Sequence, residues 1–398
     1  MEHPERSEEA EREELPAEAE DRKKSARDMV GDDEPAVFST KRLIQTLVAA
    51  VLLIVAIYVL LPKIAGLEDV FGEIRQGDPG WIAVALAFNV LAFGAYVALF
   101  RGVVGERVIH LEWRESYQIT MAGLAATRLF SAGGAGGILL TYWALRKAGM
   151  ERRQSVCRMI AFLVLLYSFY LLALVVFGVL LRTGVLHGEA PLSGTVIPAA
   201  LSGAAIVIVL LIALLPGDFE RRIEHLTSGR FGRMANRLAT APATFAQGTR
   251  TAIAFVRHPS AGALAVTGAI GFWGANVGIL WASFHALDVS VPLGVVVQGF
   301  FLGMVANLFP LAPGGVGAVD AGMIGAFVLF GIDYDAVFPA VLIYRGIAFW
   351  LPLPPGIIAF FQLRNTISRW EEEGREAGAG RLASPEREPA TSASARPE

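Results

Sequence analysis

Six uninterrupted apolar runs of about 20 residues constrain this chain more than any other feature. Inside a bilayer the backbone has no water to bond, so a run of this length is satisfied there only as a helix. The runs are Leu43–Leu61, Trp81–Phe100, Met159–Leu181, Ile197–Leu215, Gly262–Leu287 and Ala336–Phe361. The pattern predicts an all-α polytopic membrane protein.

The composition agrees with this prediction and excludes several classes of chemistry. Of the 398 residues, 54% are hydrophobic and only 18% are charged, an apolar share above that of soluble domains. The polar ends, residues 1–40 and 365–398, are predicted to be disordered tails. A single cysteine, Cys157, excludes an internal disulfide. No Walker, serine-hydrolase or zinc motif occurs, so we expect no catalytic residues, metal or cofactor.

Two further apolar regions are interrupted by glycine and proline. Tyr117–Arg146 is broken at Ser131–Gly137, and Val295–Gly331 is broken at Pro310–Gly317. At a rise of ~1.5 Å per residue, the limb before each break would be only about 21 to 23 Å long, short of the ~30 Å hydrocarbon core. We therefore expect six spanning helices plus two re-entrant helical hairpins, at 117–146 and 295–331.

Basic residues predict the side from which each hairpin enters. Arginine and lysine flank the first hairpin on both sides, whereas the flanks of the second contain neither. Under the positive-inside rule, the first hairpin enters from the cytoplasm and the second from outside. Lys41, Arg42, Arg364 and Arg369 place both termini in the cytoplasm, together with a basic loop at 217–258. The predicted location is the plasma membrane.

This topology divides the chain into two halves of opposite orientation. Residues 41–182 contain two spanning helices, a hairpin and a third helix, and residues 183–364 repeat that order with every direction reversed. CRMIAF at 157–162 in the first half resembles YRGIAF at 344–349 in the second. We therefore predict an inverted repeat, an architecture in which transporters build their central site from interrupted helices.

The candidate binding residues lie at the two breaks and in the helices that follow them. Glycines let a ligand approach the backbone, and each restarting helix offers its positive end to an anion. Arginine bonds phosphate in bidentate fashion, so Arg128, Arg158 and Arg345 are predicted to engage a headgroup phosphate. The complete predicted set is Arg128, Gly133, Gly134, Gly136, Gly137, Arg158, Asn307, Pro310, Pro313, Gly314, Gly315, Gly317, Asp320, Tyr344 and Arg345.

Simpler interpretations of these residues remain open. Asp320 would pair with Arg345, with a basic headgroup or with a proton, and its pair with Arg345 could be purely structural. Arg158 could be a snorkelling residue at the cytoplasmic edge. The glycines could serve only close helix packing.

Two motifs resemble those of a known family. PxxPGGVGxxD at 310–320, followed by LIYRGIAFWLPLPPG at 342–356, is similar to the signature of the flippase-like, lysylphosphatidylglycerol synthase transmembrane-region family. GGAGGILLTYWALRKAGM at 133–150 resembles that family's first hairpin, with Thr141 where a basic residue is common. The resemblance covers roughly Lys41 to Arg364 and implies an integral membrane protein that moves or presents polar lipids, including aminoacylated phosphatidylglycerol.

The best-known members of that family carry a soluble aminoacyl-transferase domain after the membrane part. Residues 365–398 are too few for such a domain, so lysyl transfer is not expected of this polypeptide. A separate lipid-modifying enzyme would then be its partner. Nothing in the sequence predicts nucleic-acid binding.

The predicted function is translocation between leaflets of an anionic or aminoacylated phospholipid or a polyprenyl-linked lipid. One alternative is a membrane glycosyltransferase that uses a polyprenyl-phosphate sugar, with Glu68 and Asp69 or the DYD motif at Asp333–Asp335 as its acids. Such acids also serve as helix caps. The other alternative is a lipid-binding scaffold that recruits a partner through the basic stretch Arg221–Arg257.

Overall fold

The computed structural model describes residue 74 and residues 76–105, 111–129, 135–214, 232–308 and 315–383. All of them belong to one compact unit of the chain, Tyr58–Glu398. The predicted N-terminal tail and the first apolar run, Leu43–Leu61, lie outside the described residues.

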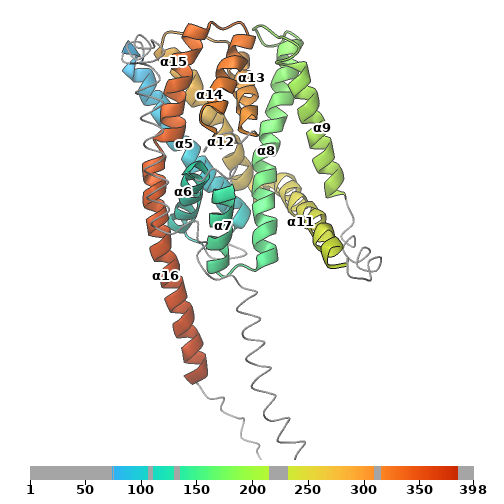
Figure 1. Cartoon of the computed structure of the whole chain (residues 1–398), viewed down its shortest axis with the longest axis vertical. Helices are drawn as coiled ribbons and strands as arrows, with labels where there is room; N and C mark the ends of the chain where they lie inside the picture. Colours follow the sequence, from blue (N-terminus) through green and yellow to red (C-terminus); the bar gives the residue numbers. More distant parts are fainter. Residues whose placement is uncertain are drawn as a thin grey trace, which may run out of the picture. The chain divides into compact units, whose positions relative to one another are not determined.

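Every regular element in the described part is a helix (Figure 1). In chain order the helices are α5 (Pro79–Val104), α6 (Trp113–Leu129), α7 (Ala135–Lys147), α8 (Arg152–Arg182), α9 (Val196–Ala213), α11 (Gly232–Arg257), α12 (Pro259–Ala286), α13 (Leu293–Met304), the 3₁₀ turn η3 (Val305–Leu308), α14 (Ala318–Leu329), α15 (Tyr334–Arg345), the π-helix η5 (Gly346–Trp350) and α16 (Leu353–Ala383).

Five of the predicted apolar runs correspond to helical segments long and apolar enough to cross a membrane. These segments are Pro79–Val104, Arg152–Arg182, Val196–Ala213, Gly262–Ala286 and Tyr334–Glu372. The prediction of an all-α polytopic membrane protein is confirmed, because several such segments occur in one chain.

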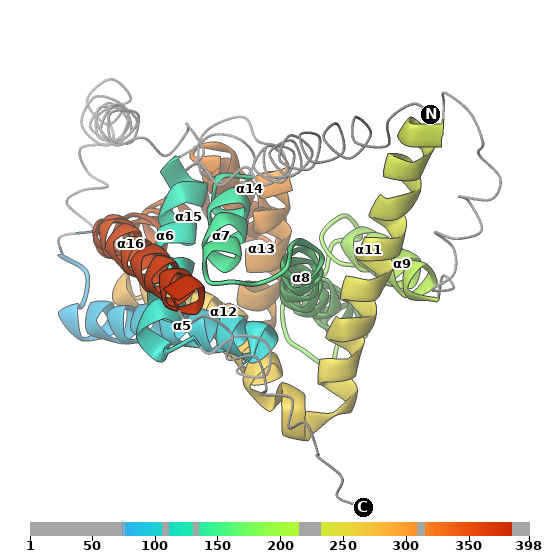
Figure 2. The same cartoon turned by 90° about the horizontal axis from the view of Figure 1, so that it is seen from below.

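Helices α5 and α12 form the most extensive helix pair in the described part, and the views from the side and from below both place them against each other (Figures 1 and 2). Small residues allow the two backbones to approach. A Cβ added at Gly102 would lie 2.5 Å from the backbone nitrogen of Ala265, and one at Gly268 would overlap the backbone of Leu99. Close packing of this kind drives helix association where no hydrophobic effect operates between helices.

Two pairs of short helices occupy the regions where hairpins were expected. Helix α6 packs against α7, and α13 packs against α14. The two pairs lie toward opposite ends of the bundle (Figure 1). The α6–α7 pair extends a few residues beyond the predicted 117–146, and the α13–α14 pair begins at Leu293 and ends at Leu329.

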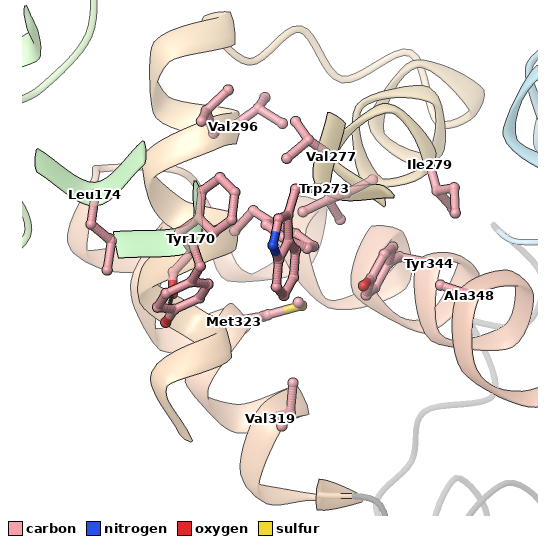
Figure 3. Packing of buried hydrophobic residues seen from close by; sticks show 14 of the residues in the cluster. Tyr170, Leu174, Trp273, Val277, Ile279, Val296, Val319, Met323, Tyr344 and Ala348 are labelled. Carbon is pink, nitrogen blue, oxygen red and sulfur yellow. Dashed lines mark hydrogen bonds between the residues drawn. The ribbon is translucent and has the colours of Figure 1, made fainter. Parts of the chain in front are cut away.

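A buried aromatic core joins the second of these pairs to α8 and α12 (Figure 3). The indole nitrogen of Trp273 donates to the carbonyl of Leu166 at 2.8 Å, and the Tyr170 hydroxyl donates to the carbonyl of Phe301 at 2.7 Å. These bonds satisfy the polar ends of large rings that are otherwise packed among apolar side chains. The core cluster contains residues of α13, α14 and α15 but none of α6 or α7.

Two predicted boundaries were wrong. The stretch 217–258 was expected to be a loop, but Gly232–Arg257 form α11, which packs on α8, α9 and α12. The many arginines in this stretch favoured the prediction of a loop. Ala246, Thr249 and Ala252 are nevertheless buried, and their spacing places them on one face of the helix.

The C-terminal tail was predicted to begin at residue 365, but α16 continues to Ala383. Tertiary contacts explain the extension. The Thr366 hydroxyl donates to Gln118 of α6 at 2.9 Å, and Glu371 pairs with Lys147 at 2.7 Å. Glutamate, arginine and alanine, which are strong helix formers, make up most of the last turns, although three glycines also lie there.

Candidate functional site

Arg345 is a buried cation in the last turn of α15, with 5% of the residue exposed. Its Nε lies 2.6 Å from Oδ1 of Asp320. Asp320 stands in the first turn of α14, where its Oδ2 accepts the backbone N–H of Gly317 at 2.8 Å. The carboxylate therefore both caps α14 and holds the arginine, so of the alternatives left open for Asp320 the structure shows the pair with Arg345.

Gly317 and Gly315 shape the backbone before that cap. Their φ angles are 80° and 68°, values that side-chain-bearing residues rarely adopt. A Cβ on Gly315 would also lie 2.8 Å from Oδ1 of Asn307. These glycines are thus required by the turn that presents Asp320.

Arg128 approaches the same region from the end of α6. Its Nη1 donates to the carbonyl of Phe349 at 2.5 Å and its Nη2 to the carbonyl of Ala348 at 3.0 Å. Both acceptors lie in the π-helix η5, and Pro352, four residues after Ala348, has no N–H to offer that carbonyl. Arg128 supplies the missing donor, and π-helical turns of this kind often mark functional sites.

The ring of Phe349 lies close to both arginines. Its ring centroid is 4.3 Å from Cζ of Arg345 and 4.9 Å from Cζ of Arg128. Among the described residues, only Asp320 forms a salt bridge with either guanidinium, and Nη2 of Arg345 is buried without a hydrogen-bond partner. Two cations and one carboxylate leave a net positive charge, which an anion such as phosphate would balance.

Arg158, the third predicted arginine, does not join this group. Its Nη1 donates to the carbonyl of Val103 at 2.9 Å, and its Cζ lies 5.8 Å from the ring centroid of Phe255. It lines a separate cavity of about 240 Å³ between α5, α6, α7 and α8. The structure therefore does not bring the three predicted arginines together, and among them only Arg128 and Arg345 lie close to the same aromatic ring.

The cavity is lined mostly by apolar side chains, among which stand hydroxyl groups that, except for Thr141, the sequence did not single out. Its hydroxyl groups come from Tyr96, Thr120, Thr127, Thr141 and Tyr167. The sequence signal for these residues was their polar character within apolar segments. It is a weak signal, because threonine in a helix commonly bonds a carbonyl of that same helix. Phe349 was missed for the opposite reason, because nothing distinguishes it from the surrounding apolar residues.

The remaining predicted residues divide into three groups. Gly136 and Gly137 lie in the first turn of α7, where a Cβ on Gly137 would overlap Thr127 and the backbone of Gly123. The Tyr344 hydroxyl is 3.5 Å from Oδ1 of Asn276. Gly133, Gly134, Pro310, Pro313 and Gly314 lie outside the described residues.

Of the acids named for the glycosyltransferase alternative, the structure describes those of the DYD motif. Asp335 lines a cavity of about 660 Å³ together with Asp78, Asp288, Trp81 and His285. Within the described ranges, no three histidine, cysteine, aspartate or glutamate side chains are grouped as a metal site would require. Glu68 and Asp69 lie outside the described residues.

Comparison with known proteins gives a consistent family. The family model described as lysylphosphatidylglycerol synthase TM region matches residues 44–356. A UPF0104 membrane protein of Methanothermobacter thermautotrophicus is 22% identical over 340 residues, which cover 80% of this chain and 96% of that protein. A second UPF0104 membrane protein match from that organism is 30% identical over 90 residues, 23% of this chain and 26% of that protein. The chain belongs to the lysylphosphatidylglycerol synthase TM region family.

Proposed function

We propose that the protein translocates a lipid with an anionic headgroup between membrane leaflets. The observation that carries the proposal is the pair of guanidinium groups near the ring of Phe349, of which only that of Arg345 is paired with a carboxylate among the described residues. A buried positive charge without a counter-ion is costly in a membrane. A phosphate that entered between Arg128 and Arg345 would offset that cost and would give Nη2 of Arg345 a partner.

Reciprocal packing supports an inverted repeat with two re-entrant hairpins. Helix α8 of the first half packs against α13 of the second, while α16 of the second half packs against α6 of the first. Helices α5 and α12, which hold equivalent places in the two halves, pack together. In this proposal the α6–α7 and α13–α14 pairs enter from opposite sides, and the apolar run Leu43–Leu61 supplies the sixth spanning helix.

The orientation follows the distribution of basic residues. Arg146, Lys147, Arg152 and Arg153 lie at the junction of α7 and α8, and the positive-inside rule assigns that end to the cytoplasm. Both termini are then cytoplasmic and the membrane is the plasma membrane. A separate enzyme would modify the lipid before or after its movement.

A second function has one specific observation in its favour. The cavity of about 660 Å³ contains Asp78, Asp288 and Asp335 beside Trp81, and carboxylates with an aromatic wall are also suited to binding a sugar. A glycosyltransferase that uses a polyprenyl-phosphate sugar would place its acids there. We rank this function second because these carboxylates are solvent-exposed helix-end residues.

Lipid scrambling in proteoliposomes tests the proposal. The purified full chain is reconstituted with a fluorescent phosphatidylglycerol, and dithionite bleaches the outer-leaflet dye. Translocation predicts bleaching beyond the half reached in protein-free vesicles, with a strong reduction in Arg345→Ala and Asp320→Asn. Bleaching that stops at one half for the wild type, or full activity in both variants, would refute the proposed mechanism.

A further inference from the structure

The cavity beside α6 and α7 combines a single arginine with several hydroxyl groups. It contains one cation, Arg158, and the hydroxyl groups of three threonines and two tyrosines. No aspartate or glutamate of the described residues lines it. The cavity therefore offers one cation and several hydroxyl groups among mostly apolar side chains, and no carboxylate of the described residues is there to receive a positive charge.

Several of these polar groups have unused hydrogen-bonding capacity. The hydroxyls of Thr141 and Tyr96 have no hydrogen-bond partner among the described residues. Thr120 and Thr127 donate to carbonyls of their own helix at 2.7 and 2.9 Å, so their oxygens can still accept. Arg158 commits one nitrogen to Val103 and forms no salt bridge in the described part of the chain. A ligand with an anionic group and several hydroxyls would satisfy this lining.

The cavity also reaches the outer surface of the helices. Ile138 of α7 and Tyr167 of α8 both line it, and 45% and 47% of these residues are exposed. In a multi-pass membrane protein such exposed apolar side chains face lipid. At about 240 Å³, the cavity is smaller than the ~300 to 1,000 Å³ of ordinary ligand pockets. It suits a headgroup whose hydrocarbon chains remain in the bilayer.

We propose that this cavity selects lipids whose headgroup is a phosphodiester bearing free hydroxyls and no amine. Arg158 pairs with the phosphate, while Thr120, Thr141 and Tyr96 bond the headgroup hydroxyls. An ammonium group would lose its water beside Arg158 and gain no carboxylate, so the cavity discriminates against it. This selectivity rests on the proposed function, because it names the lipid class that the translocase would accept.

Binding measured apart from transport tests the selectivity. The detergent-solubilised full chain is titrated with phosphatidylglycerol and phosphatidylethanolamine of identical acyl chains, and bound lipid is counted by native mass spectrometry. We expect about tenfold tighter binding of phosphatidylglycerol, which corresponds to one or two additional hydrogen bonds. Equal affinities, or tighter binding of phosphatidylethanolamine, would overturn the proposal.

Substitutions at Thr141 test whether the cavity causes the preference. Thr141→Val removes one hydroxyl and should reduce the preference about threefold. Thr141→Asp adds a carboxylate and should shift the preference toward the amine-bearing lipid. Thr267→Val is the matched control, because Thr267 is exposed on α12, bonds only its own helix and does not line the cavity. Unchanged preference in both folded Thr141 variants would overturn the proposal.

A variant at a second position guards against misfolding at Thr141. Tyr96→Phe removes the other unpartnered hydroxyl and keeps the ring that packs 5.3 Å from Phe162. It should lower the preference by a similar factor and elute from size exclusion like the wild type. Wild-type selectivity in well-folded Tyr96→Phe and Thr141→Val would contradict the assignment.

Glycerophospholipids and polyprenyl-linked lipids can carry the same headgroup chemistry, and a further titration distinguishes them. A short-chain polyprenyl-phosphate sugar is titrated against phosphatidylglycerol. Tighter binding of the sugar lipid identifies a polyprenyl source, and tighter binding of phosphatidylglycerol identifies a glycerophospholipid; both support the headgroup class. Selective binding without translocation would refute the proposed function alone, whereas translocation without headgroup selectivity would refute this inference alone.

Discussion

The α6–α7 pair and the α13–α14 pair hold equivalent places in the chain but bury different side chains. Helix α13 buries Phe300 and Phe301, whose ring centroids lie 6.2 and 5.5 Å from that of Trp273. Helix α6 buries Ser116 and Gln118, and one face of the α6–α7 pair lines the cavity that contains Arg158 and several hydroxyl groups. The second pair is fixed in an aromatic core, whereas the first borders a space that a ligand can enter.

The two pairs also contribute opposite charges to one segment, the end of α15 and the π-helix η5. From α14, Asp320 holds Arg345 at the end of α15, and from α6, Arg128 bonds carbonyls of η5. Both contacts fall on the interrupted helix that continues into α16. That segment therefore contacts both helix pairs, and a headgroup bound there would alter both contacts at once.

Breaking the Arg345–Asp320 pair should have the largest effect. Arg345→Met leaves the Asp320 carboxylate without its cation, and removing one partner of a buried pair costs about 3 to 5 kcal/mol. The double variant Arg345→Met/Asp320→Asn removes both charges, while the amide oxygen can still accept from Gly317. We expect the single variant to unfold at a much lower temperature in detergent and the double variant to recover most of that loss.

Removing the donor from the first hairpin should have the next largest effect. Arg128→Gln loses charge-assisted bonds to Ala348 and Phe349, a class worth about 1.5 to 3 kcal/mol. We expect lowered thermal stability and about a tenfold or greater loss of translocation. Arg128→Lys keeps the charge without the planar fork and should be intermediate. If Arg128→Gln translocated lipid as fast as Arg128→Lys, the positive charge at this position would not be needed for transport.

Overpacking the first hairpin should be milder. Gly137→Ala forces the backbone of Gly123 to shift, and insertions of this kind cost about 1 to 3 kcal/mol. Gly274→Ala is the control, because a Cβ there meets nothing within 4 Å. Gly137→Ala should unfold at a lower temperature than Gly274→Ala. Equal unfolding temperatures would mean that the close approach of α6 and α7 is not needed for stability.

The smallest effect is expected at the contact between α7 and α16. Lys147 and Glu371 lie 2.7 Å apart, with 41% of the Glu371 side chain exposed. Exposed pairs contribute about 0 to 1 kcal/mol and weaken with salt. Glu371→Gln should therefore change thermal stability little, and less in high salt than in low salt. A large loss of thermal stability would mean that this contact stabilises the fold about as much as the Arg345–Asp320 pair.

The sequence predicted the five apolar helical segments that the structure describes and the two interruptions, because membrane length leaves few alternatives. It named Arg345 as one of several partners for Asp320, because a buried charge needs a partner. It did not predict that Arg158 lies apart from Arg128 and Arg345, since that depends on which faces of α6, α8 and α15 meet. The π-helix and the role of Phe349 arise from Pro352 and from Arg128, more than 200 positions earlier. Neighbouring residues alone do not reveal such long-range contacts.

The most direct test is translocation by Arg345→Met/Asp320→Asn in proteoliposomes, read by dithionite bleaching of a fluorescent phosphatidylglycerol. This variant is expected to fold, so a loss of activity reports on the site rather than on stability. We predict bleaching that stops at the protein-free half, while the wild type bleaches further. Wild-type translocation by the folded double variant would contradict an anion site between Arg128 and Arg345.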